Sequence, residues 1–156
     1  MLKYRLVFVV FALGCPAVTS AQATYVSPGF HIGYRFGEGG GVVTGVEVSI
    51  VQWGNRSYGG VVLAWDGIHG MNNFHVGFEY GSGFIGACVG PVVGASKDTA
   101  DIGLRITPYA GAILIPYYTF QFFQFLPSSH QVGMYVKFPI PTGGGSKLRF
   151  GEGENG

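Results

Sequence analysis

The sequence has few charged residues for its length. Asp, Glu, Lys and Arg make up 11% of the 156 residues, against roughly 25% in a typical soluble domain. The formal net charge is +1, so neither a basic patch for nucleic acid nor an acidic interaction tail is present. This scarcity of charge argues against an ordinary solvated surface.

Cysteines and long apolar runs are also scarce. Residues 110–125, AGAILIPYYTFQFFQF, approach the length of a membrane helix. Pro116 and the crowded aromatic and β-branched residues favour a strand, and a helix stays open as an alternative. The two cysteines are Cys15 and Cys88. Removal of Cys15 with a leader would leave Cys88 without a disulfide partner.

The first 23 residues predict an export signal. Lys3 and Arg5 precede an apolar run, and Ala21-Gln22-Ala23 offers a small-residue cleavage site. The sequence ALGC, ending at Cys15, loosely resembles the lipobox of bacterial lipoproteins, so lipidation is an open alternative. We therefore expect a signal peptide over 1–23, a folded domain over 24–140 and a flexible glycine-rich tail over 141–156.

Alternating apolar and polar residues are abundant. Together with 15% aromatics and 28 glycines, they indicate many short strands and tight turns. Eight such segments are predicted as strands, each near the roughly 9–11 residues that a tilted strand needs to cross a bilayer. They are Gly29–Gly37, Val42–Trp53, Tyr58–Gly67, Asn73–Gly81, Phe84–Gly94, Asp101–Gly111, Ile113–Phe123 and Gln131–Ile140.

The two faces of these segments differ in composition. One face is apolar and uncharged, as in Phe30, Ile32, Tyr34 and Phe36, and the other mixes glycine with isolated charges. A soluble sheet has the same period, but a sparse, glycine-heavy polar face is typical of a narrow lumen. The sequence therefore predicts an all-β fold, an eight-stranded antiparallel up-and-down transmembrane β-barrel with its apolar face towards lipid. A secreted soluble barrel, whose apolar face lines a ligand cavity as in lipocalins, is the alternative.

Two further expectations concern prolines and aromatic residues. Bulges or strand ends are expected near four prolines, because a missing N–H weakens the ladder: Pro91, Pro108, Pro116 and Pro139. Some large aromatic residues fit either an interfacial girdle or ordinary core packing: Trp53, Tyr58, Trp65, Tyr80, Tyr117 and Tyr118.

Eight ionisable side chains are predicted to form a polar network in the lumen: His31, Arg35, Glu47, Asp66, His75, Glu79, Arg105 and Lys137. A symmetric first hairpin would place His31 opposite Glu47. Buried charges must be paired, and an eight-stranded interior is just wide enough for its own side chains, so we expect no continuous pore. We also expect no cofactor and no metal site, because no close pair of metal-ligand residues is present. Cys88 is expected to be an inert buried thiol near His75.

The chain resembles the small outer-membrane β-barrel proteins of Gram-negative bacteria over residues 29–140 and the leader. The most specific match is QVGMYVKF, which resembles the β-signal that the barrel assembly machinery recognises, with Gln131, Gly133, Val136 and Phe138 at the signal positions. Eighteen residues follow Phe138, whereas this strand usually ends proteins of the family. The resemblance implies a bacterial outer-membrane location, lipid and the assembly machinery as partners, and a monomer.

A lipid A-modifying hydrolase is a further alternative, because some barrels of this class use Ser, His and a carboxylate. Their deacylases have His two residues before Ser. The four histidines, His31, His69, His75 and His130, are not followed by Ser at that spacing. The sequence therefore predicts a structural or surface-interaction role without catalysis, and the resemblance in fold supplies no activity.

Overall fold

The computed structural model describes residues 23–37, 39–54 and 56–142. The predicted signal peptide lies outside these residues apart from Ala23, as do Cys15 and the tail beyond Thr142. Among the described residues, no helix is long and apolar enough to cross a membrane. The helix alternative for residues 110–125 is wrong, because most of that segment forms a strand.

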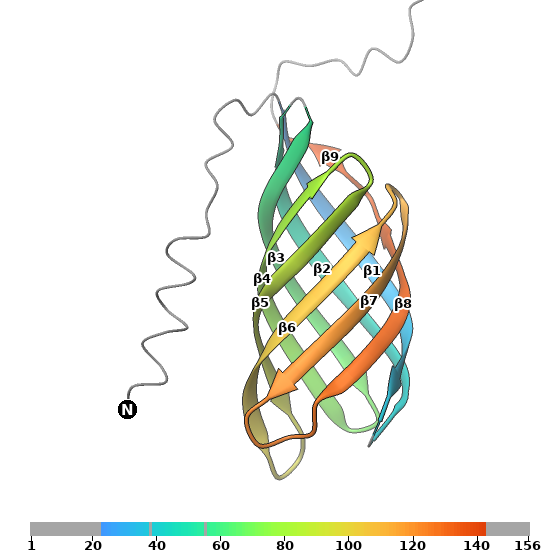
Figure 1. Ribbon diagram of the computed structural model, residues 1–156, viewed down its shortest axis with the longest axis vertical. Coiled ribbons are helices and arrows are strands. Elements are labelled where there is room, and N and C mark those ends of the chain that lie inside the picture. Colours follow the sequence, from blue (N-terminus) through green and yellow to red (C-terminus); the bar gives the residue numbers. More distant parts are fainter. Residues whose placement is uncertain (1–22, 38, 55, 143–156) are drawn as a thin grey trace, which may run out of the picture.

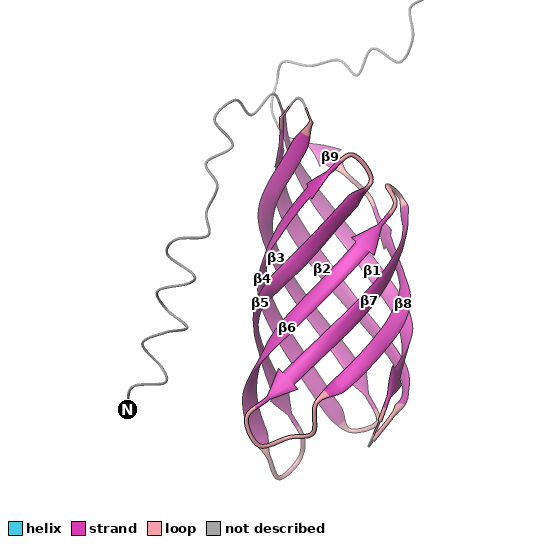
Figure 2. Cartoon of the chain, in the orientation of Figure 1, coloured by secondary structure: helices cyan, strands magenta, loops and turns pink. Residues whose placement is uncertain are grey.

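The described chain folds as a ring of antiparallel strands (Figure 2). The bounds are β1 (Ala23–Phe36), β2 (Gly41–Trp53), β3 (Ser57–Ile68), β4 (Met71–Ser82), β5 (Ile85–Ala95), β6 (Ala100–Ala110), β7 (Leu114–Phe123), β8 (Ser129–Lys137) and the short β9 (Ile140–Pro141). Each strand pairs with the next, and β1 pairs with both β2 and β8, which closes the barrel. The predicted eight-stranded up-and-down barrel is confirmed.

The register around the barrel gives its tilt. A walk from strand to strand through paired residues returns to β1 ten residues further along, at Phe36 after starting at Val26. Its steps are Val26, Ile50, Val61, Phe78, Val89, Ile106, Phe120, His130 and Phe36. With ordinary strand spacings, this shear tilts the strands by about 40°. The slant is visible in Figure 1.

The connections are short at both ends of the barrel. At the end where β1 begins and β9 lies, here called the terminal end (upper in Figure 1), the connections are residues 54–56, 83–84 and 111–113. At the opposite end, the loop end, they are residues 37–40, 69–70, 96–99 and 124–128. No large loop domain covers either mouth within the described ranges.

Some details of pairing differ from expectation. His31 is opposite Gly45, and Glu47 is opposite Gly29, so the predicted pairing of His31 with Glu47 is wrong. β1 begins at Ala23 and not at Gly29. The last strand breaks after Lys137 and resumes as β9, which pairs with the start of β1 in the same register.

The prolines mostly interrupt pairing without shifting it. The ladders lack pairs at Pro91 on its β4 side and at Pro108 on its β7 side, yet the register continues unchanged, so bulges are absent there. Pro139 lies in the break after β8, and Pro116 is the third residue of β7. A missing N–H therefore removes a pair but does not insert a residue.

Candidate functional site: the lumen

The faces of the barrel are inverted relative to a soluble protein. Phe30, Ile32, Tyr34 and Phe36 point outwards and are 47–57% exposed. Each of the other seven long strands also has exposed large apolar residues. The polar alternates point inwards. All eight side chains of the predicted network lie in the interior, and seven of them are at most 5% exposed; Lys137, at the terminal end, is 11% exposed.

Asp66 is the centre of one group of charges. Its Oδ1 accepts from Arg105 Nη1 at 2.5 Å, and its Oδ2 lies 3.8 Å from Arg35 Nη2 and accepts from Asn73 Nδ2 at 3.0 Å. We call Arg35, Asp66 and Arg105 the aspartate cluster. It joins β1, β3 and β6 across the lumen and carries one formal excess positive charge.

Lys137 is the centre of a second group with the opposite excess. Its Nζ lies 2.6 Å from Glu47 Oε1 and 3.2 Å from Glu79 Oε2. The Tyr109 hydroxyl donates to the same Glu79 oxygen at 3.0 Å, and Tyr58 donates to the Tyr109 hydroxyl at 3.2 Å. We call Glu47, Glu79 and Lys137 the lysine cluster. It joins β2, β4 and β8 and carries one formal excess negative charge.

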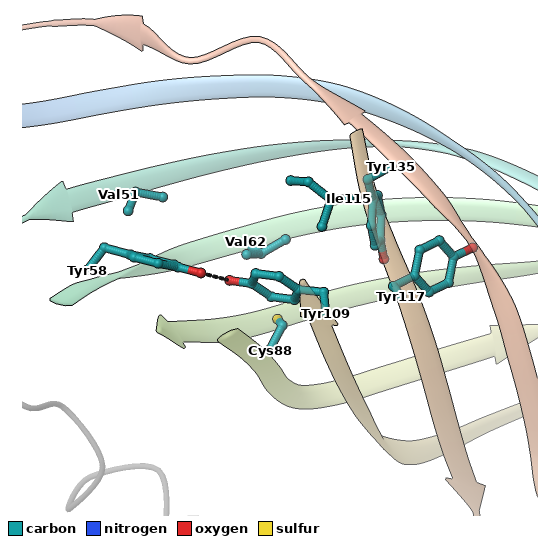
Figure 3. Close-up of a cluster of buried hydrophobic side chains, with 8 residues drawn as sticks. All are labelled: Val51, Tyr58, Val62, Cys88, Tyr109, Ile115, Tyr117 and Tyr135. Carbon is teal, nitrogen blue, oxygen red and sulfur yellow. Dashed lines mark hydrogen bonds between the residues drawn. The ribbon is translucent and has the colours of Figure 1, made fainter. Parts of the chain in front are cut away.

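Aromatic side chains fill the space between strands in the middle of the barrel. Tyr117 and Tyr135 pack with ring centroids 4.2 Å apart, and His31 meets both rings edge-on (Figure 3 shows the two tyrosines). The Tyr135 hydroxyl also accepts from Arg105, and the Tyr117 hydroxyl accepts from Gln131. These bonds connect the aromatic layer to the charged network.

The described lumen has room for little besides its own side chains. A cavity of about 10 Å³, the size of a single water molecule, lies between the lysine cluster and Arg105. A hydrated ion does not fit such a space. The interior is therefore closed.

His75 and Cys88 form a separate contact beside this cavity. His75 Nδ1 lies 3.0 Å from the Pro91 carbonyl oxygen, and His75 Nε2 lies 3.4 Å from Cys88 Sγ. Both side chains are buried. Cys88 therefore lies close to His75, as expected. Within the described ranges, no three or more His, Cys, Asp or Glu side chains are arranged to hold a metal ion.

The residues of the predicted β-signal divide between the two faces. Gln131 is buried in the lumen, and Gly133 lies on the same face, where an added Cβ would come within 2.5 Å of the Tyr117 hydroxyl. Phe138 is exposed on the outside, and Val136 is half-buried. The glycine therefore makes space for a lumen tyrosine.

Several lumen residues lie on a strand whose faces the sequence analysis did not assign. Ile115, Tyr117, Thr119 and Gln121 of β7 are all buried in the interior. Their alternation with outward Pro116, Tyr118, Phe120 and Phe122 could have identified them, but both sets are largely apolar or aromatic. The interior positions of Tyr58 and Tyr117 also exclude these two from an outer girdle.

Comparisons with known proteins identify no family for this chain. No protein-family model matches the sequence, and no curated protein matches it. A solved structure described as a de novo designed transmembrane β-barrel is 12% identical, with a TM-score of 0.42, over 73% of this chain and 95% of that chain.

Proposed function

We infer that the chain is an integral outer-membrane β-barrel with a closed, charge-paired lumen and a structural or surface-interaction role without catalysis. The observation that carries this proposal is the inversion of the two faces. Leu63 on the outside is 57% exposed, while Arg105 on the inside is 1% exposed. Charge is expensive in lipid and apolar surface is expensive in water, so a hydrocarbon environment fits this arrangement.

The height of the apolar surface supports a bilayer. Ten strand residues tilted by about 40° span about 25 Å, the height of the apolar band in outer-membrane barrels. Aromatic side chains lie near both margins of this band: Trp53 and Tyr80 towards the terminal end, and Tyr34 and Phe36 towards the loop end. Both described chain ends lie at the terminal end, which in bacterial barrels faces the periplasm.

The lipocalin-like alternative requires the opposite faces. It needs an apolar cavity inside, whereas the interior holds two ion clusters and a cavity of about 10 Å³. The geometry therefore counts against a ligand-binding soluble barrel.

The hydrolase alternative gains no support from Ser129 and His130, a serine and a histidine that are neighbours in the sequence. Ser129 is buried and donates to Gln121 Oε1, while His130 points outwards and packs against Phe120. A serine and a histidine on opposite faces of one strand cannot share a proton. This arrangement supports a role without catalysis at that position.

Fractionation tests the membrane assignment. The full chain, expressed with its own leader in a Gram-negative host, should be extracted from the outer membrane only by detergent and should migrate differently on a gel when unboiled. Recovery from the soluble periplasm would refute the proposal. The purified barrel should also produce no stepwise conductance in planar bilayers, because the lumen is closed; ion-sized steps would refute the closed state.

Assembly and oligomeric state are part of the same proposal. The QVGMYVKF segment, with Gln131, Gly133, Val136 and Phe138, is proposed as the contact for the barrel assembly machinery. Closure of β8 on β1 leaves no open seam along the barrel wall among the described strands, which favours a monomer in the outer-membrane lipid.

A further inference from the structure

The cavity of about 10 Å³ lies between two separate hydrogen-bonded groups. On one side, Glu79 belongs to the lysine cluster; on the other, Arg105 donates to Asp66 and to the Tyr135 hydroxyl. Among the described side chains, no hydrogen bond or ion pair joins the two groups directly. We propose that one water molecule binds in this cavity, donates to Glu79 Oε1, accepts from the Tyr135 hydroxyl and thereby joins the two clusters into one network.

Glu79 provides a buried acceptor at the cavity. Its side chain lines the cavity and is 2% exposed, and its Oε1 has no hydrogen-bond partner among the described residues. The other carboxylate oxygen, Oε2, accepts from the Tyr109 hydroxyl and from Lys137 Nζ, which hold the group in place. A buried carboxylate oxygen without a donor costs free energy. A water molecule in the cavity would supply that donor.

Tyr135 provides the matching donor. Its side chain is buried and also lines the cavity. The hydroxyl oxygen accepts from Arg105 Nη2 at 3.3 Å, but a hydroxyl group can donate as well as accept. Among the described residues, the Tyr135 hydroxyl has no acceptor for its own proton. This proton is therefore available to a water oxygen.

The size and charge of the cavity favour water over other ligands. A volume of about 10 Å³ accommodates one water molecule. Water is neutral, so it leaves the equal and opposite formal charges of the two clusters unchanged. Its dipole fits their order, because its hydrogen faces the cluster with the negative excess and its oxygen faces the cluster with the positive excess.

This water would make the polar network continuous along the lumen. Hydrogen bonds and ion pairs would then run from the terminal end towards the loop end through Tyr58, Tyr109, Glu79, the water, Tyr135, Arg105, Asp66, Arg35, Gln121 and Ser129. Loss of the water would separate this chain of contacts into two halves. Four residues that line the site, Val62, Cys88, Tyr109 and Tyr135, are drawn in Figure 3.

A crystal structure of the full chain folded in detergent, at a resolution that shows ordered water, tests the site directly. The expected result is one water at hydrogen-bond distance, roughly 2.5–3.0 Å, from both Glu79 Oε1 and the Tyr135 hydroxyl oxygen. Tyr135→Phe should lose this water. Tyr117→Phe removes the hydroxyl of a neighbouring ring that does not line the cavity, and it should retain the water. An empty cavity in the wild type, or a water that persists in Tyr135→Phe, would overturn the proposal.

Urea unfolding in detergent micelles tests the same bridge in solution. In Glu79→Gln, Tyr109 and Lys137 would retain the amide oxygen, so an N–H group would replace the acceptor of the water. Glu79→Gln and Tyr135→Phe then disrupt the two ends of one bridge. Their combined effect on the unfolding equilibrium constant should be at least about threefold smaller than the product of the single effects.

The matched control pairs Glu79→Gln with Tyr117→Phe, and these two effects should multiply. Both tyrosine variants keep the aromatic ring, so the contact of Lys137 with the Tyr135 ring is preserved. Heat-dependent gel mobility shows that each variant is folded. Effects that multiply in both pairs would overturn the bridge.

Discussion

Removal of the Asp66 carboxylate is expected to destabilise the barrel strongly. Asp66 is 0% exposed and is the shared partner of Arg35 and Arg105. Asp66→Asn keeps the size of the side chain but leaves two guanidinium groups facing each other in a closed lumen. Removing one partner of a buried ion pair costs about 3–5 kcal/mol, so we expect a loss in that range.

The measurement is reversible urea unfolding of the barrel in lipid vesicles, followed by tryptophan fluorescence and unboiled gel mobility. Asp98→Asn, in the exposed connection between β5 and β6, is the control and should change stability by less than about 0.5 kcal/mol. Combining Asp66→Leu with Arg35→Met and Arg105→Met should recover much of the loss, because a buried ionic group replaced as a whole by apolar side chains is often neutral. A single Asp66→Asn variant as stable as the control would show that the aspartate cluster is solvated, and the closed-lumen argument would fail.

Three further predictions test the outer face, the β-signal and the second cluster. Leu63→Arg, at the middle of the apolar band, should lower the free energy of unfolding in lipid vesicles by about 2–4 kcal/mol. Ile85→Arg, near the margin of the band, should lower it by about 0–1 kcal/mol. Equal losses for the two variants in urea unfolding would contradict a bilayer around the barrel. Gly133→Ala should slow folding or reduce yield on unboiled gels, because the added methyl group meets the Ile32 carbonyl oxygen and both the ring and the hydroxyl of Tyr117; a wild-type yield would contradict this close packing. Lys137→Met should destabilise the barrel by leaving the carboxylates of Glu47 and Glu79 without their shared partner; unchanged stability in urea unfolding would contradict the lysine cluster.

The face of the barrel on which each side chain lies was predictable from the sequence, because it depends only on the two-residue period of a strand. The cross-strand partner of each residue was not predictable, as the first hairpin shows. His31 is opposite Gly45 instead of Glu47 because the hairpin is centred one residue earlier than a symmetric reading of the turn places it. A shift of one residue in the centre moves every partner by two, which preserves the face and changes the contact. Thus His31 was correctly placed in the lumen and given the wrong neighbour.

Contacts across the lumen depend on all the turns together. Arg35 meets Asp66 on β3 and Gln121 on β7, and their relative heights follow from the shear of ten residues accumulated around the ring. An error in the predicted strand register at any one turn would place Arg35 opposite different residues across the lumen. This is why the sequence indicates which charges share the interior but not that they divide into two clusters.

The two clusters and the glycines follow from one geometric limit. An eight-stranded barrel cannot hold a large side chain at every inward position. A large inward side chain on one strand therefore requires a glycine nearby. Gly45 leaves room for His31, Gly77 for His75 and Cys88, and Gly133 for Tyr117. The few polar side chains that remain must pair with one another. The formal positive excess of the aspartate cluster is equal and opposite to the formal negative excess of the lysine cluster. Low charge and high glycine content are therefore two consequences of the same narrow interior.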